Sequence, residues 1–386
     1  MKEAGRTDWF MFGLAAGLAL FGALMVYSAS AMMSMKESAD ASQYTYFLKQ
    51  SIFVVIGIAA MLVVSRFDYR LLNKRWVVYS ILAVTSIALF AVLFFPAING
   101  AQRWIRVGGF SFQPSELAKI ALPIFLAWFL AKNKEVVGEI KTTVLPCVGG
   151  LALLAGLVML EKDLGTTIVL CAIFSAVYFS AGAKLMHIGA VAAGLVLIGV
   201  GAILFAPWRV ARIMAFLDPY KYSDDEAYQV VQSLYAIGSG GVFGEGFAKG
   251  QQKLFYLPYP YSDFIFSVVG EELGLMGTMA VLIAFALLLW RGTKAALSSP
   301  DRFGTLLGIG ITTGVIVQAL FNISVVISIL PAKGIPLPFI SYGGSSVLVT
   351  LIAVGILLSI SRYSTETVKS EVTARSNAQR RRVRTA

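Results

Sequence analysis

Charged residues are scarce in this sequence. Asp, Glu, Lys and Arg make up 14% of its 386 residues, whereas soluble domains average about 25%. Hydrophobic residues reach 58%, and the mean hydropathy is +0.77. This balance excludes an ordinary soluble protein. It indicates an integral membrane protein, in which the bilayer replaces much of the need for one large core.

Cysteine and histidine are rarer still. Cys147 and Cys171 both lie inside apolar runs, which is typical of small buried hydrophobes. Their spacing suggests neither a disulfide framework nor a metal site. The single histidine, His187, begins an apolar stretch beside a short loop. We therefore expect neither catalysis through a Ser–His or Cys–His pair nor a zinc centre.

Long apolar runs are abundant instead. The first is too long for a signal-peptide core of about 7–15 residues, so it is read as a retained membrane helix. The expected fold class is an all-α integral membrane protein with about ten transmembrane helices and no separate soluble domain. One polytopic membrane domain is expected over 1–362, followed by a basic, disordered tail over 363–386. The expected spans are 9–31, 47–65, 77–95, 114–131, 143–160, 164–181, 186–206, 264–290, 303–330 and 343–361.

Lys and Arg are unevenly divided between alternate connections. If the N-terminus lies inside, most of the basic residues fall on the inner side, which predicts that both termini are cytoplasmic. The basic run at 380–384 is then a juxtamembrane tail suited to anionic lipid or to topology control, and no nucleic-acid partner is expected. Polar and glycine-rich signals gather in four outer connections, 96–113, 161–165, 207–263 and 331–346.

Two of these outer connections carry charges that need an explanation. Glu116 and Lys119 share one face at the start of a helix, either as a structural ion pair or as charges that orient a substrate. Arg103 and Arg106 lie just before them and suit a phosphate or pyrophosphate, although lipid head groups or another loop would also satisfy them. Asp163 has two interpretations as well, a helix cap or a polar site residue.

The long outer connection contains the glycine-rich segment GSGGVFGEGFAKG, at 238–250. It lacks the flanking strand and helix of a nucleotide-binding fingerprint, so we interpret it as a flexible loop that approaches a ligand closely. The preceding segment, DDEAYQVVQSLYAIG, has apolar residues at helical spacing. It predicts a short amphipathic helix at the outer interface.

The most informative acid is Asp263, in QQKLFYLPYPYSDFIF at the edge of an apolar helix. Asp263 or Ser262 would serve as a helix N-cap. Alternatively, desolvation among aromatic residues would raise the pKa of Asp263, opposed by the helix N-terminus and by Lys253, leaving a carboxylate that is ionised yet able to accept a proton. Glu271 and Glu272 lie in the apolar run that follows, and we interpret them as polar contacts inside the bundle.

Several motifs together resemble the SEDS proteins (shape, elongation, division and sporulation). The resemblance covers about residues 10–362 in the family's order, and the lysine of LPAKG favours a division member over an elongation member, with a sporulation member left open. The motifs that carry it are NGAQRWIRVGGFSFQPSELAK, EKDLGTT, QSLYAIGSGGVFGEG, QQKLFYLPYPYSDFIFSVVGEELG and ILPAKGIPLPFISYGGSS.

The resemblance implies a peptidoglycan glycosyltransferase that polymerises lipid II on the outer face of the bacterial cytoplasmic membrane, at the division septum. It also implies a class B penicillin-binding protein of the FtsI type as partner, besides other division proteins and membrane lipids. Asp263 matches the family's essential acid, and we expect it to act as general base on the acceptor hydroxyl. The candidate substrate-binding residues are Arg103, Glu116, Lys119, Asp163, Gln251, Lys253, Ser262, Lys333 and Ser341.

One position departs from the family's pattern. Where the family commonly has a glutamate after YLP, this chain has Tyr259, so no role for a carboxylate there carries over. No cofactor is certain, although a divalent cation, Mg²⁺ or Mn²⁺, would help Arg103, Lys119 or Lys253 to stabilise the pyrophosphate leaving group. A lipid II flippase and a non-catalytic division scaffold remain as alternative functions.

Overall fold

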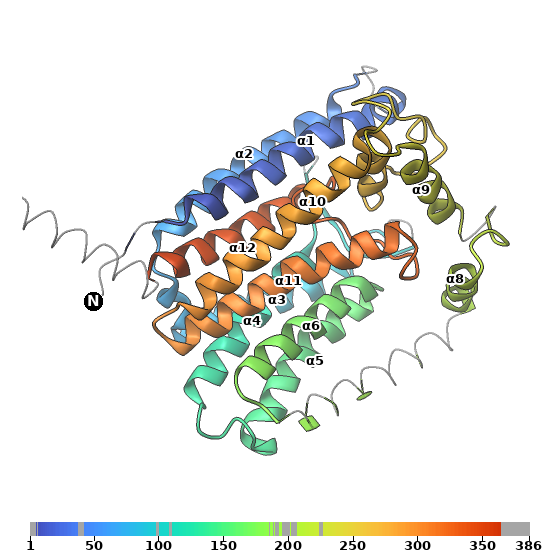
Figure 1. Ribbon diagram of the computed structural model, residues 1–386. Coiled ribbons are helices and arrows are strands. Elements are labelled where there is room, and N and C mark those ends of the chain that lie inside the picture. Colours follow the sequence, from blue (N-terminus) through green and yellow to red (C-terminus); the bar gives the residue numbers. More distant parts are fainter. Residues whose placement is uncertain are drawn as a thin grey trace, which may run out of the picture.

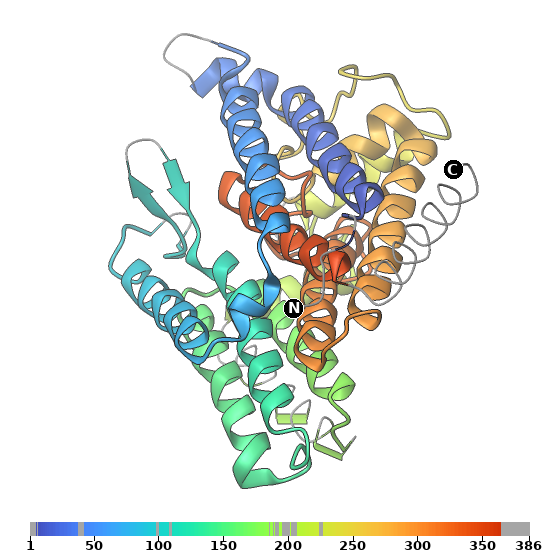
Figure 2. The same ribbon diagram turned by 90° about the vertical axis from the view of Figure 1, so that its left-hand side faces the viewer.

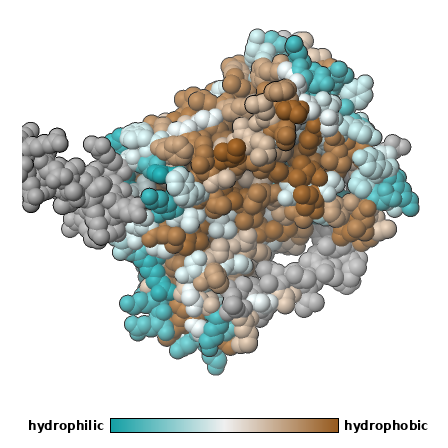
Figure 3. All heavy atoms as spheres, viewed as in Figure 1, coloured by the Kyte–Doolittle hydropathy of each residue, from teal (hydrophilic) through white to brown (hydrophobic). Residues whose placement is uncertain are grey.

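The computed structural model describes residues 5, 7–37, 42–97, 100–107, 110–184, 186–187, 189, 193–194, 201, 207–223 and 227–363. Within these ranges, eight helices are long and apolar enough to cross a membrane. Figure 3 shows apolar side chains over the middle of the helices and hydrophilic ones toward both ends. The expected fold class, a polytopic α-helical membrane protein, is confirmed. The expected span 186–206 falls mostly outside the described residues.

The helices run side by side in one bundle (Figure 1). Their bounds lie close to the expected spans because each follows a long apolar run between polar connections. The bundle helices are α1 (Trp9–Glu37), α2 (Thr45–Arg66), α3 (Arg75–Val92), α4 (Pro114–Lys132), α5 (Leu145–Leu160), α6 (Leu164–Ser180), α10 (Ile265–Leu297), α11 (Arg302–Val326) and α12 (Gly344–Arg362).

The core of the bundle is formed by α4, α11 and α12, which are the most buried of the long helices. Helix α11 packs against α4, α6 and α10, and α12 packs along α2. By contrast, α2 and α3 present most of their surface outward, as expected of helices that face lipid. The bundle thus surrounds three central helices, each of which begins or ends beside an outer connection.

Helix α10 is interrupted at Gly274, which has φ 64° and ψ −161°. A Cβ atom there would lie 2.4 Å from the backbone nitrogen of Gly244, so both the conformation and the space require glycine. The break leaves a short first segment of α10, directly after Asp263.

One end of the bundle carries most of the irregular structure. It holds the hairpin of β1 (Ile105–Val107) and β2 (Phe110–Phe112), together with the short helices α8 (Pro207–Leu217) and α9 (Tyr228–Ser239). The distribution of Lys and Arg predicts that this end is extracytoplasmic, and we call it the outer end. The expected amphipathic helix corresponds to α9, which packs its apolar side on α10 and α11. Helix α8 was not anticipated.

The opposite, cytoplasmic end is closed by short connections and ion pairs. It includes a 3-10 turn, η1 (Tyr69–Asn73), and a π-helical turn, η2 (Ile140–Val144). Asp8 pairs with Arg291 at 2.6 Å, and Arg70 pairs with Asp301 at 3.2 Å. These ion pairs bond the cytoplasmic ends of helices that are far apart in the sequence.

Candidate active site

Asp263 lies at the outer end, immediately before α10. The N-cap residue of α10 is Phe264, and no side chain caps the helix. The hydroxyl of Ser262 donates instead to the carbonyl of Tyr259, at 3.2 Å. The helix-cap interpretation of Asp263 and Ser262 is therefore wrong, because the helix begins too late for either side chain to reach its first amides.

A second outer connection, 331–343, is bonded to the backbone around Asp263. The side-chain amide of Asn322 donates to the carbonyls of both Asp263 and Ile335, each at 2.7 Å. The hydroxyl of Ser341 donates to the carbonyl of Ser262 at 2.7 Å, and Tyr342 N–H donates to the carbonyl of Tyr261 at 2.8 Å. These bonds fix the position of Asp263 without using its carboxylate.

The Asp263 carboxylate faces Gly334 of that connection. A Cβ atom on Gly334 would lie 2.8 Å from Oδ2 of Asp263, so a larger residue would crowd the acid. Among the described residues, the carboxylate accepts no hydrogen bond and forms no ion pair. Burial raises its pKa to about 6; the charge of Arg103 lowers it, and that of Asp163 raises it. The acid is thus ionised at neutral pH, yet more basic than an ordinary aspartate.

Arg103 joins the hairpin connection to the short connection between α5 and α6. Its guanidinium donates to the carbonyl of Glu161 at 3.3 Å and to that of Lys162 at 2.6 Å. Its positive charge acts on Asp263 from this position. Arg106 lies on β1 and is exposed. Gly108 and Gly109, which follow Arg106 closely in the sequence, lie outside the described residues.

Asp163 caps α6, as one of the two interpretations predicted. Its Oδ1 accepts from the backbone N–H of Thr166 at 3.1 Å, and its Oδ2 accepts from the Thr166 hydroxyl at 2.9 Å and from the Gln113 amide at 3.3 Å. The same carboxylate acts electrostatically on Asp263. The two interpretations of Asp163 are therefore compatible.

Glu161 is a residue that sequence analysis missed. It is fully buried, and among the described residues neither of its carboxylate oxygens has a hydrogen-bond partner. Burial and the charge of Asp163 raise its pKa to about 9, while Arg103 lowers it, so Glu161 is a neutral acid at pH 7. Its place beside Asp163 in EKDLGTT was the one available signal, and it did not reveal this burial.

Glu116 and Lys119 form the ion pair that their spacing suggested, at 2.7 Å. Lys119 also donates to the side-chain oxygen of Gln318, whose amide donates to the carbonyl of Pro336 at 2.9 Å. The pair is therefore linked through α11 to the connection that faces Asp263. The structural interpretation of the pair is confirmed, and a role in substrate binding stays a prediction.

Lys253 lies in a buried ion pair. Its Nζ is 2.6 Å from Oε1 of Glu272 and donates to the hydroxyl of Ser28 at 2.8 Å. The expected effect of Lys253 on the pKa of Asp263 is not found; Arg103 supplies the opposing positive charge instead. Because its charge is already neutralised inside the protein, Lys253 is a poor candidate for holding a pyrophosphate.

Glu271 and Glu272 hold the long outer loop against α10, in agreement with their interpretation as polar contacts within the bundle. Glu271 accepts from the backbone N–H groups of Gln251 and Gln252, at 2.6 and 3.0 Å, and Glu272 accepts from that of Ala248 at 2.9 Å. We call these contacts, together with the Lys253–Glu272 pair, the loop latch.

The glycines of 238–250 serve this packing. A Cβ atom on Gly240 would lie 2.0 Å from the carbonyl oxygen of Gly270, and one on Gly244 would lie 2.2 Å from that of Glu272. The segment thus approaches α10 of its own chain, whereas the sequence suggested a close approach to a ligand. Only glycine leaves room for this contact.

The other predicted binding residues lie around the same end. The side chain of Gln251 is exposed, and Lys333 is half-buried. Ser341 is buried and already bonded to Ser262. Tyr259 has φ 50°, is 47% exposed and meets Tyr261 edge to face. The described residues contain no group of three His, Cys, Asp or Glu side chains placed to hold a metal ion.

Comparison with known proteins agrees with this architecture. Residues 8–366 match the family model of the FtsW, RodA and SpoVE cell cycle proteins. A probable peptidoglycan glycosyltransferase FtsW of Geobacter metallireducens is 41% identical, over 94% of this chain and 96% of its own length. The stage V sporulation protein E of Bacillus subtilis is 39% identical, over 90% of this chain and 94% of its own length.

Solved structures share the fold. One belongs to a peptidoglycan synthase complex studied for the structural coordination of polymerization and crosslinking, with a TM-score of 0.76 and 27% identity over 92% of this chain and 98% of that one. The crystal structure of RodA from Thermus thermophilus has a TM-score of 0.66 and 26% identity, over 93% of this chain and 98% of that one.

The fold and the converging outer connections define a multi-pass membrane protein with one polar site at the end of its bundle. The sequence match is more specific than that class. The chain belongs to the FtsW/RodA/SpoVE family of cell cycle proteins, the SEDS family that its motifs resemble.

Proposed function

We propose that this protein is a peptidoglycan glycosyltransferase that polymerises lipid II, with Asp263 as the general base. The relatives' shared name supports the class of enzyme, a glycosyltransferase. The observation that carries the choice of residue is the Asp263 carboxylate, which has a raised pKa, no hydrogen bond among the described residues and a charged arginine nearby. A general base works best when its pKa lies near the working pH.

In the proposed reaction, the acceptor sugar hydroxyl attacks the anomeric carbon of a lipid-linked sugar. Asp263 takes the hydroxyl proton as the new glycosidic bond forms and the bond to the lipid pyrophosphate breaks. Because the leaving pyrophosphate carries its own negative charge, it needs electrostatic stabilisation more than a protonating acid. A single base and one displacement distinguish this scheme from the two-carboxylate mechanism of glycoside hydrolases.

Arg103 is the best placed group to stabilise the leaving pyrophosphate. Its charge acts on Asp263, and hydrogen bonds to the carbonyls of Glu161 and Lys162 hold it in position. Lys119, like Lys253, is already paired inside the bundle, with Glu116 and Gln318, so it is a weaker candidate than Arg103. A guanidinium held in this way is suited to phosphate oxygens.

The role of Mg²⁺ or Mn²⁺ stays a prediction. Since Mg²⁺ commonly keeps several waters and binds substrate phosphates without a dedicated cage of protein ligands, the pyrophosphate would supply most of its protein-independent ligands and leave the Asp263 carboxylate to take the proton. A bound cation would neutralise charge on the leaving group. The roles of Gln251, Lys333 and Tyr259 toward donor or acceptor likewise remain to be assigned.

The biological setting that we infer is cell division. The matched relatives include FtsW and a stage V sporulation protein, and the structural relative is part of a synthase complex that coordinates polymerization with crosslinking. These relatives support a class B penicillin-binding protein as partner and the septum as the place of action. Co-purification with that partner, and septal localisation of a fluorescent fusion, would test this inference.

The decisive experiment is polymerisation of labelled lipid II by the purified protein, with and without the partner. Wild type should yield glycan polymer, and Asp263→Asn should yield none while keeping the wild-type unfolding temperature. Asp218→Asn, which changes an exposed acid of the same outer connection, is the matched control and should polymerise normally. Full polymerisation by Asp263→Asn would refute the base. If the wild type made no polymer with the partner, the flippase or scaffold function would be favoured instead.

A further inference from the structure

A second candidate binding site extends from the cytoplasmic connection between α2 and α3 toward the first turns of α4 and α12. It is an apolar cavity of about 570 Å³ between α2, α3, α4 and α12. None of the residues proposed for catalysis or substrate binding lines it. Its walls include Val64, Leu72, Ile81, Ile120, Val349 and Ile356.

The cavity exists because α2 and α3, which are consecutive in the sequence, pack against different helices and diverge. Helix α2 packs along α12, whereas α3 packs on α4. Figure 2 shows α2 in blue and α3 in lighter, cyan-blue leading away from their short connection in different directions. Three lining residues, Phe67, Leu71 and Val84, are 59%, 46% and 60% exposed on the protein surface. The cavity is therefore open to the surrounding bilayer. An apolar cavity does not hold water well, so hydrocarbon is its natural occupant.

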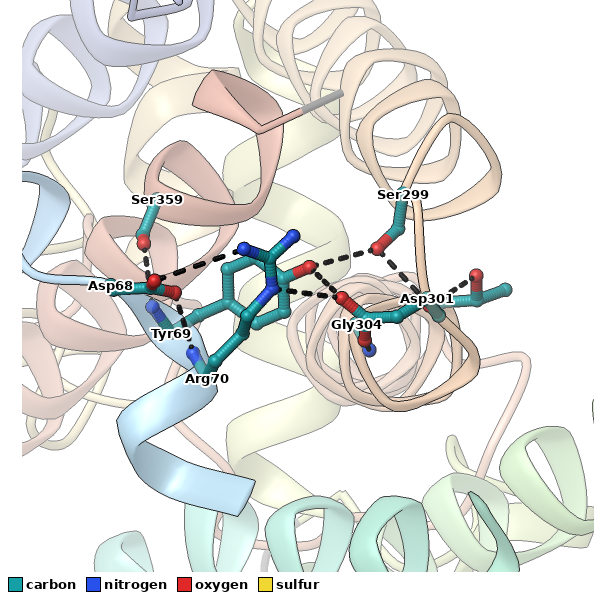
Figure 4. Close-up of polar contacts among 8 residues, drawn as sticks. Asp68, Tyr69, Arg70, Ser299, Asp301, Gly304 and Ser359 are labelled. Carbon is teal, nitrogen blue, oxygen red and sulfur yellow. Dashed lines mark hydrogen bonds and ion pairs between the residues drawn. The ribbon is translucent and has the colours of Figure 1, made fainter. Parts of the chain in front are cut away.

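The cytoplasmic wall of the cavity is held rigidly by the polar contacts shown in Figure 4. The hydroxyl of Tyr69 donates to the carboxylate of Asp301, and Arg70 pairs with the same carboxylate at 3.2 Å. The backbone N–H of Tyr69 donates to the hydroxyl of Ser359 at 3.1 Å. Burial and the bond to Asp301 raise the pKa of Tyr69, so it stays a neutral donor. The segment that carries Phe67 and Leu71 is thereby preformed.

Positive charge flanks this wall. Arg66, Lys74 and Arg75 are exposed and lie immediately before and after the lining segment. The single acid of 66–75, Asp68, is bonded to Arg70, both through its backbone N–H at 2.9 Å and as an ion pair at 3.9 Å. Three basic side chains thus remain beside the cavity at the level of the lipid head groups. Basic pockets of this kind between helices favour anionic lipids of the cytoplasmic leaflet.

We propose that the cavity binds one acyl chain of an anionic phospholipid of the cytoplasmic leaflet, with its phosphate at Arg66, Lys74 and Arg75. The proposal does not depend on the proposed glycosyltransferase activity. It places the lipid chain against Leu117 and Ile120 of α4, the helix that carries Glu116 and Lys119.

Native mass spectrometry of the delipidated protein tests this proposal, with phosphatidylglycerol and phosphatidylcholine of identical chains as probes. Phosphatidylglycerol should bind more tightly. Because each basic residue near an anionic head group contributes roughly a fivefold change in affinity, the triple variant Arg66→Gln/Lys74→Gln/Arg75→Gln should lose about 100-fold. Its affinity for phosphatidylcholine, whose phosphate is balanced by its own choline cation, should fall much less.

The matched control is Lys132→Gln/Lys134→Gln/Lys141→Gln. It removes three exposed charges from the cytoplasmic connection between α4 and α5, which does not line the cavity. This control should bind both lipids like wild type. An equal loss of phosphatidylglycerol binding in the control would overturn the proposal, since any cytoplasmic charge would then suffice.

Filling the cavity tests the hydrocarbon part of the proposal. Ser80→Phe and Val84→Trp each place an aromatic ring at an exposed lining position, where the fold should tolerate it. Each variant should keep the wild-type unfolding temperature and lose binding of both lipids. Unchanged phosphatidylglycerol binding in a folded filled variant would show that the head group alone is recognised, and would overturn the cavity site.

Discussion

At the scale of the residue, two acids of the outer end differ in the states that their surroundings impose. Burial raises the pKa of Asp263 to about 6 and that of Glu161 to about 9. At neutral pH the first is a carboxylate and the second is a neutral acid. Burial is the largest cause of both shifts, and the difference lies in the charges: the next cause is the positive charge of Arg103 for Asp263, which lowers the pKa, but the negative charge of Asp163 for Glu161, which raises it. Each state has a measurable consequence.

If Asp263 is the base, the pH profile of kcat/KM for lipid II polymerisation should show an acidic limb. Asp263 must be ionised to accept a proton, so activity should rise with pH and level off above about pH 6, the pKa of Asp263. An ordinary aspartate would place this limb near pH 4. The measurement is the initial polymerisation rate at low substrate concentration across pH 4.5–8.

Two substitutions should move that limb in opposite directions. Arg103→Gln removes a charge that lowers the pKa of Asp263, so the limb should shift to higher pH. Asp163→Asn removes a charge that raises this pKa, so the limb should shift to lower pH. Shifts in the same direction, or none, would contradict the assignment of the limb to Asp263. The opposed signs cannot come from a general loss of stability.

Glu161 predicts a pH dependence of stability. Its pKa is about 9 in the folded protein and about 4.3 in an unfolded chain. The folded state therefore keeps a proton that the unfolded state loses, and stability falls as pH rises between these values, by up to about 1.4 kcal/mol per pH unit. Glu161→Gln, a neutral isostere, should remove this slope and unfold at a higher temperature than wild type at pH 8.

The check is the difference in unfolding temperature between Glu161→Gln and wild type, measured at pH 5 and at pH 8. The difference should grow with pH. Glu139→Gln, an exposed acid of another connection, should show no such growth. If the difference for Glu161→Gln were constant, Glu161 would have to be charged in the folded protein.

At the scale of the element, the sequence predicted most helices within a few residues of their bounds. Apolar runs and their charged ends determine where a helix crosses the bilayer, and α4 begins at Pro114 as expected. Partners far apart in sequence were not predictable in this way. Ser28 and Glu272 are 244 positions apart, and no local pattern reveals their hydrogen bond or that of Lys253. From sequence alone, Lys253 therefore remained a candidate for substrate binding.

The same limit applies to the candidate site. Its members were found because four polar connections fall on one side of the membrane. How Asn322 joins Asp263 to Ile335, and how completely Glu161 is buried, depend on packing between α6, α11 and the connections at the outer end. Helix α8 was not predicted, because it is amphipathic and its 11 residues are too few for a membrane span.

The loop latch provides a prediction at this scale. Removing one member of a buried ion pair leaves the other charge unpaired, which typically costs about 3–5 kcal/mol. Lys253→Met or Glu272→Gln should therefore lower the unfolding temperature and increase hydrogen exchange in the outer loop at 244–257. Polymerisation should also fall, because this loop leads directly into Asp263. The double variant should be less destabilised than the two single effects added together.

A matched control lies in the same loop. Lys249 is exposed, so Lys249→Met removes a lysine of equal charge without breaking a buried pair. It should leave both unfolding temperature and hydrogen exchange unchanged. Strict additivity of Lys253→Met and Glu272→Gln, or an equal effect of Lys249→Met, would show that the latch does not hold the loop.

At the scale of the whole molecule, the two ends of the bundle are stabilised differently. The cytoplasmic end uses its charges in pairs and caps, such as Asp8 with Arg291 and Asp301 with Arg70. The outer end pairs Lys253 and Lys119 internally but leaves the Asp263 carboxylate without a hydrogen bond among the described residues. An unsatisfied acid does not stabilise the fold, so its retention at the outer end is consistent with a chemical role.

This difference between the two ends predicts that Asp301→Ala and Asp263→Asn have opposite effects on stability and turnover. Asp301→Ala removes the α11 cap to the Gly304 N–H, at 2.9 Å, and the bonds from Tyr69 and Arg70. It should cost about 1–3 kcal/mol and lower the unfolding temperature, yet leave kcat per folded enzyme near wild type. Asp263→Asn should do the reverse, abolishing turnover at an unchanged unfolding temperature.

The unfolding temperature and kcat should be measured on the same preparations, with kcat taken below the unfolding temperature of each variant. If Asp301→Ala abolished turnover while still folded, the two ends would be coupled, and the outer site could not be regarded as self-contained.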